Sequence, residues 1–534
     1  MLTLTASQQA ALARGNGAIG HTVHIKRSKD YYLCDCDPVQ AGLASYYMEC
    51  LSSITQVSSR IDPISRKAQV SDMTLTLVDD GYARELNNET YLLHALVEVT
   101  MMVSRGDTLA SGYESFPIFT GYVSDVQSAD GEINIQCKSA LGALVYQPVV
   151  GAWFDEHHVD VITDILDRAG ISSTYVDSSA LAAAKTSSTI GHFVVGRASI
   201  VSPATDTGIN GGINSPADAR SMIDELLDVL GCGLIPQENG KLTLRAYNSA
   251  AAAVDSWTSD DIGGIEQRSM LGMVTNQAEL DFFNGQSFEI HDDTASVATA
   301  LDGSSKTYIK YAASTPWAGA GVMRTWSSFL AGAGAGSTFV IGDYTTLVVR
   351  LGACCGMRDS YPIASQPADA KIGGSRTGYL MVADELIAIS ALVGDNAYTV
   401  NAGWYDYSSG SPPPATVTKT IHQRATATIA SRALNGTTAA DHASGSEVYD
   451  HTIPYLWSYR RVSRGKYGVP VLRCRTSLAK YAVQLGDFVT ITHPNVITST
   501  LTGMTGSTFE VIGKEVDSSG DTPSIAWELA KVQP

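Results

Sequence analysis

Residues 378–389 read GYLMVADELIAI, and residues 432–448 read RALNGTTAADHASGSEV. The first stretch has a short apolar run on each side of the acidic pair Asp384 and Glu385, which is typical of a largely buried strand pair or a bent strand. The second has Gly436 and Gly445 on either side of small residues and one histidine, His442, as in a tight exposed turn. We therefore expect a β-rich module in this part of the chain.

The length and composition indicate a multidomain globular protein. A chain of 534 residues is too long for a single core, and about three or four domains are expected. No apolar run approaches the roughly 20 residues that span a bilayer. The first residues, MLTLTASQQ, lack the basic and apolar regions of a signal peptide. We expect the protein to be made and assembled in the cytoplasm.

The charge balance argues against a protein that grips nucleic acid. The chain has 36 basic and 54 acidic residues, for a net charge of −18. Binding to phosphates requires the opposite balance. An acidic surface facing DNA instead lets the DNA slide past, so a conduit is favoured over a clamp.

The cysteine pattern predicts free thiols. No two cysteines form a C-x-x-C pair, which removes support for a zinc ribbon or a thioredoxin-type site. Buried free thiols in a reducing cytosol are the expectation. The eight residues are Cys34, Cys36, Cys50, Cys137, Cys232, Cys354, Cys355 and Cys474.

Alternating patterns predict strands over residues 1–150. After a helix expected at residues 7–14 and ended by Gly15, alternation appears at 70–78 (VSDMTLTLV) and again at 116–126 (FPIFTGYVSDV). Strands at this spacing, separated by turn residues, indicate an antiparallel barrel or sandwich.

Residues 151–250 change period and predict a small α+β unit. In 160–170 (DVITDILDRAG) the apolar residues share one helix face, and Gly170 is a plausible end. Residues 215–231 repeat this design, with Ser215 as the expected N-cap and Pro216 in the first turn. A hairpin is expected over 234–245.

The remaining sequence returns to strand character. Residues 251–300 are expected to begin a second β-barrel, 301–450 to form a Gly-, Ser- and Ala-rich β insertion, and 451–534 to complete the barrel, with strand character resuming near Tyr455. The predicted fold class is mainly β (α+β). It has two tube-like β-barrel domains, at 1–150 and at 251–300 with 451–534, and a small α+β domain between them.

The opening module resembles a segment of tail proteins from double-stranded DNA bacteriophages. In those proteins a strand of the pattern "ligdEiI.v" precedes "tRg.nGTtaa.Ha.Gs.V". Glu385, Arg432 and His442 occupy the glutamate, arginine and histidine positions of these patterns. The resemblance implies that the chain is part of a virion.

Other segments, taken in order, resemble the phage tail hub, the trimeric baseplate protein at the distal end of the tail tube. Residues 54–66 with 70–78 resemble the opening barrel of the family, and 116–137 the strand pair that follows it. Residues 215–245 resemble a helix before "dGkL.l", and 478–492 resemble "l.pGD.v.it". Residues 509–516 resemble the next strand.

The resemblance implies a structural role with named neighbours. The chain is expected to form a homotrimeric ring that adapts the six-fold tail tube to the three-fold tail tip and lines the DNA ejection channel. A distal tail protein or tail tube protein is expected above it, a tape measure protein within it, and a tail fibre or tip protein below. Some tail-tip hubs carry an iron–sulfur cluster, so four converging cysteines are an alternative to free thiols; otherwise no cofactor is expected.

The candidate catalytic groups have simple structural interpretations. Residues 15–20 (GNGAIG) match G-x-G-x-x-G, but the order helix, loop, strand is wrong for a dinucleotide site. In 155–158 (DEHH) adjacent histidines diverge on a helix. Asp384 and Glu385 face opposite sides of a strand, and His442 is expected to make a structural hydrogen bond. With no H-E-x-x-H, G-x-S-x-G or Walker A sequence, we expect no enzyme and no catalytic, cofactor or metal residues.

Two other functions are alternatives to the hub. In one, the 301–450 insertion is a receptor- or glycan-binding module with Trp404, Tyr405 and Tyr407 as an aromatic platform, although ordinary strand packing also explains these rings. In the other, the chain is a cell-wall hydrolase, for which no suitably patterned segment is present.

Overall fold

The computed structural model describes most of the chain. The described residues are 2–15, 17–27, 29–78, 92–129, 131–149, 151–186, 194–200, 217–248, 250–270, 275–282, 286–292, 307–312, 323–343, 378–402, 417–466, 468–497, 503–518 and 523–532.

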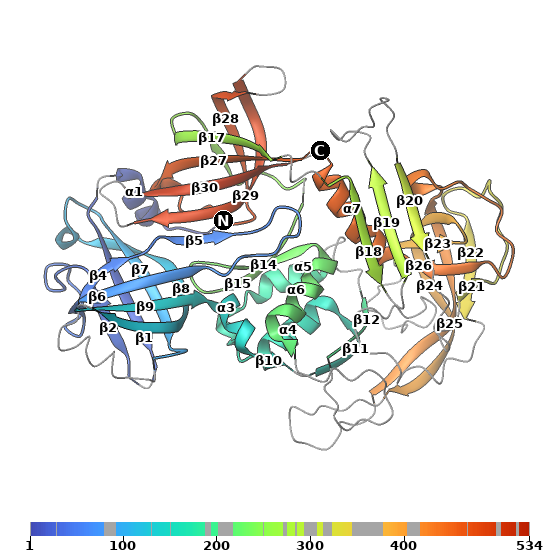
Figure 1. Ribbon diagram of the computed structural model, residues 1–534, viewed down its shortest axis with the longest axis horizontal. Coiled ribbons are helices and arrows are strands. Elements are labelled where there is room, and N and C mark those ends of the chain that lie inside the picture. Colours follow the sequence, from blue (N-terminus) through green and yellow to red (C-terminus); the bar gives the residue numbers. More distant parts are fainter. Residues whose placement is uncertain are drawn as a thin grey trace.

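The chain is mainly β, as predicted, and its N-terminal part forms a curved eight-stranded sheet (Figure 1). Strands such as β6 and β9 bury every second residue, which places a row of apolar side chains on the core face. In spatial order the strands are β3 (Met48–Glu49), β2 (Tyr31–Cys34), β1 (Ile19–Lys26), β7 (Leu96–Ser104), β8 (Tyr113–Ala129), β9 (Glu132–Ser139), β6 (Asp72–Val78) and β4 (Leu51–Ile54).

The first helix, α1 (Ala6–Arg14), packs beside this sheet and has clear end signals. Thr5 and Gln8 form a reciprocal capping box at its start. Gly15, with φ of 70°, ends it in the left-handed conformation that glycine adopts without strain. A single-turn 3₁₀ helix, η1 (Leu109–Ser111), follows β7.

A small α+β unit follows, seen below the centre of Figure 1. Its helix α4 (His158–Arg168) buries the predicted apolar face, and Gly170 has a positive φ of 76°. The other elements are α3 (Ala140–Ala143), η2 (Leu144–Tyr146), β10 (Pro148–Val149), β11 (Gly151–His157), η3 (Ser173–Tyr175), α5 (Ser178–Thr186), β12 (Val194–Ile200), β13 (Ala217–Asp218), α6 (Ala219–Leu230) and the hairpin β14 (Cys232–Pro236) with β15 (Leu242–Ala246).

The start of α6 was predicted wrongly. The helix is capped by Asp218, whose carboxylate accepts a hydrogen bond of 2.8 Å from the Ser221 backbone N–H. Residues 217–218 pair with β10 as strand β13, so the backbone is extended immediately before the helix. Ser215 and Pro216, the expected N-cap and first-turn residues, lie outside the described residues.

A second curved sheet, at the top of Figure 1, contains mainly C-terminal strands. Its path is β16 (Asp255–Trp257), β28 (Phe488–Ile497), β29 (Gly503–Asp517), β30 (Ser524–Lys531), β27 (Val469–Ser477) and β17 (Ile262–Met270). One further strand, β5 (Val57–Arg60), comes from the N-terminal part of the chain and pairs with β29. The 3₁₀ helix η9 (Leu478–Lys480) follows β27.

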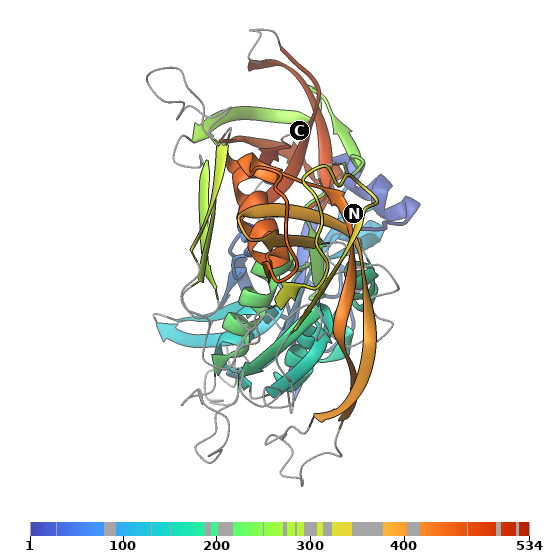
Figure 2. The same cartoon turned by 90° about the vertical axis from the view of Figure 1, so that its right-hand side faces the viewer.

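The insertion contains a closed barrel, at the right of Figure 1. Its hairpin β24–β25 is much longer than the other barrel strands and projects away from the body in Figure 2. The barrel strands are β21 (Met323–Thr325), β22 (Thr338–Asp343), β25 (Val417–Ser431), β24 (Glu385–Ala402), β23 (Gly378–Val382) and β26 (Glu447–Asp450), and η8 (Leu434–Gly436) follows β25. A three-stranded sheet of β18 (Gln277–Phe282), β19 (Gln286–Asp292) and β20 (Thr307–Ala312) lies beside it.

The segment around Tyr455 forms a helix, so the predicted return of strand character there was wrong. Helix α7 (Thr452–Gly465) buries Tyr455 and Val462, which lie two turns apart on one face. They pack with Met381 of β23, with Leu386 of β24 and with Ile290 of β19. The helix therefore connects the insertion to the second sheet.

One continuous apolar core joins the first sheet, the α+β unit and the second sheet, while the closed barrel has a core of its own. Burial of apolar surface at about 25 cal/mol per Å² makes such a shared core the main force that holds the three parts together. In the described part of the chain, none of the helices is long and apolar enough to span a membrane.

We expect Gly233→Ala to destabilise the fold, because a Cβ there would lie 2.5 Å from the Arg66 carbonyl oxygen. That oxygen belongs to backbone and cannot move aside cheaply, so a loss of about 1–3 kcal/mol is expected in chemical denaturation. Gly332→Ala is the matched control, since a Cβ at Gly332 meets nothing within 4 Å. Equal stability of the two variants would contradict the close approach.

Candidate functional site

The two sheets meet at a joint formed by β5 and the segment after it. β5 runs antiparallel to β29, with Val57 opposite Val516 and Arg60 opposite Gly513. The Ile61 N–H then donates to the Ile512 carbonyl over 2.8 Å. The first sheet therefore cannot leave the second without breaking main-chain hydrogen bonds.

A buried ion cluster lies beside this joint. Arg66 and Glu510, each only 1% exposed, pair through Arg66 Nη1 and Glu510 Oε1. Arg464 of α7 reaches Glu510 Oε2 at 3.4 Å, and its guanidinium lies 3.8 Å above the Tyr247 ring. Burial, together with the nearby Arg66 charge, lowers the pKa of Arg464 to about 10, although Glu510 opposes the shift. One carboxylate thus holds segments from both halves of the chain.

The Arg66 backbone is also constrained. Its φ of 65° lies in the left-handed region, which is unusual for a residue with a side chain. The turn is held by the Asp62 carboxylate, which accepts from the backbone N–H of Ile64 at 2.9 Å and of Ser65 at 2.6 Å. These bonds offset the strain and aim Arg66 into the joint.

A second buried cation lies on the other side of β29. The Lys514 ammonium group is 2.6 Å from Glu238 Oε1 and donates to the carbonyl oxygens of Tyr481 (2.8 Å) and Val483 (2.9 Å). It also lies 4.5 Å from the Tyr481 ring centre. Burial lowers the pKa of Lys514, while Glu238 acts in the opposite direction. None of these three partners is on β29. Lys514 therefore connects β29 to the turn of the β14–β15 hairpin, which contains Glu238, and to the segment after β27, which contains Tyr481 and Val483.

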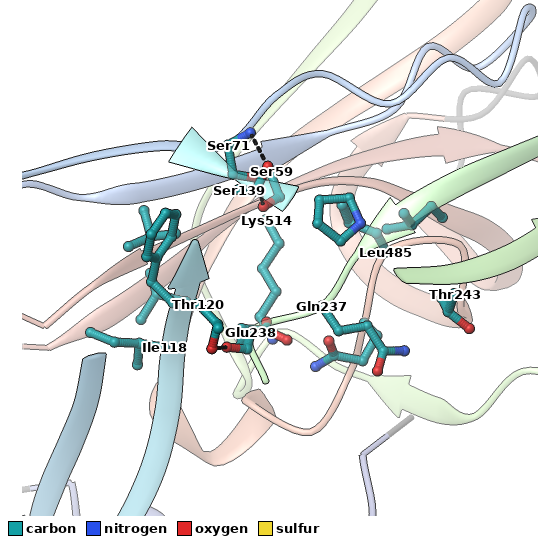
Figure 3. Close-up of a pocket in the computed structure, with 16 residues that line it drawn as sticks. Ser59, Ser71, Ile118, Thr120, Ser139, Gln237, Glu238, Thr243, Leu485 and Lys514 are labelled. Carbon is teal, nitrogen blue, oxygen red and sulfur yellow. Dashed lines mark hydrogen bonds and ion pairs between the residues drawn. The ribbon is translucent and has the colours of Figure 1, made fainter. Parts of the chain in front are cut away.

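Figure 3 shows the small cavity beside Lys514, with Glu238 and Thr120 on one side and Ser59, Ser71 and Ser139 on the other. The Thr120 hydroxyl donates to the Glu238 carbonyl oxygen at 3.2 Å, and Ser59 and Ser71 share a hydrogen bond of 2.6 Å. A volume of about 20 Å³ has room for about one water molecule and no substrate. The polar groups around this cavity therefore connect neighbouring elements, and the cavity is too small to hold a larger molecule.

A larger groove of about 660 Å³ covers the outer face of the second sheet. Glu528 on its floor pairs with Arg60 at 2.6 Å and also with Arg473. Both arginines are 39% exposed, so solvent weakens these pairs. Because the carboxylate neutralises part of the positive charge, the groove does not present the basic surface that phosphates require.

The opening sequence module is a buried hydrogen-bond network centred on Glu385. Asp384 lies exposed in the turn between β23 and β24, while Glu385 is 1% exposed and points into the barrel. Arg432 Nε donates to Glu385 Oε1 at 2.8 Å and Arg432 Nη2 donates to Oε2. His442 Nε2 lies 2.8 Å from Glu385 Oε2. Of the three residues that carry the resemblance, Arg432 and His442 therefore both bond to Glu385.

Backbone groups complete the Glu385 network. The N–H groups of Ala433 and Ala440 donate to its two oxygens at 3.2 and 3.1 Å. Burial raises the pKa of Glu385, but the hydrogen bonds from Arg432, His442 and Ala440 outweigh it, and the net pKa is lowered. Phe329 covers the cluster, with its ring centre 5.1 Å from the Arg432 guanidinium. The arrangement fixes the loop 432–445 against the barrel.

The predicted residues fall into four groups. His442 makes the expected structural hydrogen bond, but it is buried and not part of an exposed turn. The segment 15–20 runs from helix α1 into strand β1, the order that argued against nucleotide binding. Residues 155–158 span the end of β11 and the start of α4. Trp404, Tyr405 and Tyr407 lie outside the described residues.

The described cysteines are free thiols on separate elements, apart from the neighbours Cys34 and Cys36; they are Cys34, Cys36, Cys50, Cys137, Cys232 and Cys474. Burial raises the pKa of Cys137, Cys232 and Cys474 to about 12, which keeps these thiols protonated. Within the described residues, no three His, Cys, Asp or Glu side chains are grouped to hold a metal ion. Cys354 and Cys355 lie outside them.

Sequence reasoning missed the buried charges of the joint. Glu510 and Lys514 lie in a segment recognised only as a strand, and neither has a sequence neighbour that identifies its partner. Arg66 is 444 positions from Glu510, and no local pattern connects them. The one available signal was that Glu510 and Lys514 are charged residues on an otherwise apolar strand, and a charged residue buried in such a strand needs a partner.

Comparison with known proteins gives similarities at low levels only. No protein-family model and no curated protein sequence matches this chain. A tail protein from Neisseria meningitidis MC58 is similar, with a TM-score of 0.41, 7% identity and 96% of both chains covered. The prophage MuSo2 43 kDa tail protein from Shewanella oneidensis has a TM-score of 0.40 and 9% identity, with 96% of this chain and 98% of that chain covered. Prophage tail protein gp18 from Listeria monocytogenes EGD-e has a TM-score of 0.29 and 9% identity, with 95% of this chain and 94% of that chain covered. These values are too low to assign a function to the chain.

We expect Glu385→Gln to loosen the loop 432–445, because the amide cannot accept all the bonds that the carboxylate accepts. A loss of about 3–5 kcal/mol is typical when one partner of a buried ion pair is removed. Hydrogen exchange at Ala433 and Ala440 should rise. Asp384→Asn, which changes the adjacent exposed carboxylate, is the control and should leave exchange unchanged.

The same carboxylate should make the barrel sensitive to acid. Because the folded pKa of Glu385 lies below its ordinary value of 4.5, its stabilisation is complete above about pH 4.5 and is lost as the pH falls through the lowered value. Protection of Ala433 and Ala440 from exchange, measured relative to the intrinsic exchange rate at each pH, should therefore fall on acidification in the wild type. The dependence should be absent in Glu385→Gln; if it persists there, another group is responsible.

For the joint, we expect Lys514→Met to cost about 3–5 kcal/mol, because it leaves the Glu238 carboxylate desolvated without its cation. The double variant Lys514→Met with Glu238→Leu should recover most of this loss in denaturant unfolding, since it removes both charges. No recovery in the double variant would show that Lys514 does not stabilise the joint through Glu238.

Proposed function

We propose that this chain is a structural protein of a bacteriophage tail, the baseplate or tail hub. In this proposal three copies form a ring that adapts the six-fold tail tube to the three-fold tail tip and lines the DNA ejection channel. The observation that supports it is the joint, which fixes two curved sheets of similar size in one rigid body. The sequence segments that resemble tail hubs agree with this role.

The symmetry argument depends on that rigidity. Two similar sheet units in each chain, multiplied by three chains, present six quasi-equivalent units to a six-fold tube, while a true three-fold axis remains. The six units can be evenly spaced only if the two units of one chain keep a fixed relation. The shared core, the β5–β29 pairing and the buried charges provide that fixed relation.

The proposed neighbours follow from the place in the virion. A distal tail protein or tail tube protein lies above the ring, a tape measure protein passes through it, and a tail fibre or tip protein lies below, at the distal end of the tail. DNA passes without specific binding. A net charge of −18 supports this, because a basic channel would retain the phosphates.

The insertion offers a second candidate function, a receptor- or glycan-binding module. The closed barrel has its own apolar core, and the long β24–β25 hairpin projects from the body (Figure 2). A domain that folds around its own core can present an outer surface without disturbing the ring. The hub and the binding module are compatible functions of one chain.

We expect the purified protein to form trimers of about 170 kDa, three times the chain mass of 56.6 kDa. Light scattering would give this mass, and negative-stain averages should show three-fold rings with a central hole. A monomer at every concentration tested, and also in the presence of a tail tube protein, would contradict the ring. Binding of host envelope fragments by such a monomer would favour the module.

A further inference from the structure

His21 lies between a carboxylate and a serine hydroxyl, away from the joint clusters described above. His21 Nδ1 is 2.6 Å from Asp35 Oδ2, and His21 Nε2 is 2.8 Å from Ser518 Oγ. Both distances are within the range required for proton transfer between a nucleophile, a base and the group that orients the base. Asp35, His21 and Ser518 are therefore connected, in that order, by two consecutive hydrogen bonds.

The Asp35 carboxylate also fixes which imidazole nitrogen carries the proton. An ionised carboxylate can only accept hydrogen bonds, so Nδ1 of a neutral His21 must donate to it. Nε2 is then left with its lone pair, and the Ser518 hydroxyl donates to that nitrogen. This is the tautomer in which a histidine can remove a proton from serine.

The backbone holds His21 and Asp35 in this relation. The His21 N–H donates to Asp35 Oδ1 at 2.6 Å, and the Asp35 N–H donates to the His21 carbonyl oxygen at 3.3 Å. His21 is on β1 and Asp35 follows β2, so the antiparallel pairing of these strands sets the distance. The Asp35 carboxylate therefore accepts hydrogen bonds from both the main chain and the ring of His21.

Ser518 reaches this pair from the other sheet, at the end of β29. The His21 side chain is 5% exposed and Ser518 is 9% exposed, so both are buried, whereas the Asp35 side chain is 25% exposed. Because so little of Ser518 is exposed, only a small reactive molecule could reach its hydroxyl. A bond that merely linked the two sheets would not need a carboxylate fixed on the far nitrogen of the histidine.

We propose that Ser518 is an activated nucleophile for carboxylic esters of small acyl groups, with His21 as the general base and Asp35 as the positioning residue. Ser518 Oγ forms a bond to the acyl carbon while its proton moves to His21 Nε2. The ester C–O bond breaks, and the leaving alcohol takes that proton. Water then attacks the acyl-serine, gives a proton to His21, and releases the carboxylic acid as the proton returns to Ser518.

No local sequence pattern identifies these three residues. His21 and Asp35 are 14 positions apart, and Ser518 is 497 positions from His21. A search for short nucleophile motifs therefore cannot find them, because the two sheets bring them together only after folding. The inference is independent of the tail hub proposal.

The test uses the full-length protein with a fluorophosphonate probe and with p-nitrophenyl acetate. We expect the probe to label Ser518, identified by peptide mass analysis, and the ester to give a burst of p-nitrophenol followed by slow turnover. Asp35→Asn should slow labelling at least about 100-fold while the protein stays folded, because the wrong tautomer then faces Ser518. Ser518→Ala should abolish labelling at that position.

Ser507→Ala, on the same strand, is the matched control and should label like the wild type. The thermal unfolding midpoint of each variant is measured alongside, which separates loss of reactivity from loss of fold. The proposal is overturned if Ser518 is not labelled in the folded wild type, or if Asp35→Asn labels at the wild-type rate. In either case the three residues form only a hydrogen-bonded bridge between the sheets.

Discussion

The pairing of β5 with β29 is the constraint on which the rest of the structure depends. It places N-terminal residues in a sheet made otherwise of later strands, and so brings the first sheet, the α+β unit and the second sheet around one core. Only in this closed arrangement can Arg66, Glu510 and Lys514 be buried at a tolerable free energy, because each finds its partners on another element. The apolar core supplies the driving force, and these charges restrict how the sheets meet.

The insertion is also held together by a buried charge that is paired and hydrogen-bonded. Glu385 binds an arginine, a histidine and two backbone N–H groups, and so fixes a loop that has little apolar surface of its own. Networks of this kind are costly when half satisfied and rigid when complete. Rigidity at both places suits a protein whose proposed work is to hold geometry between neighbours.

The sequence predicted those features that local physics determines. The helix α4, the Gly15 and Gly170 helix ends and the mainly β class follow from periodicity and turn chemistry. The Glu385, Arg432 and His442 positions were recognised by resemblance, but their mutual contact was not predicted. The helix at Tyr455 was missed because its buried face becomes clear only when β19, β23 and β24 are in place. Glu510 lies 444 positions from Arg66, and Ser518 lies 497 positions from His21, so no local sequence pattern connects the members of these pairs.

The long sequence separation across the joint also affects how the protein is made. Gln56, next to β5, bonds to Asp517, 461 positions later. At about 5–20 residues per second, a ribosome needs roughly 25 to 90 seconds to synthesise that interval. During this time β5 has no β29 to pair with, and its edge stays open to other chains. The joint can close only after β29 has been synthesised, so a translation product that stops before β29 cannot form the β5–β29 pairing.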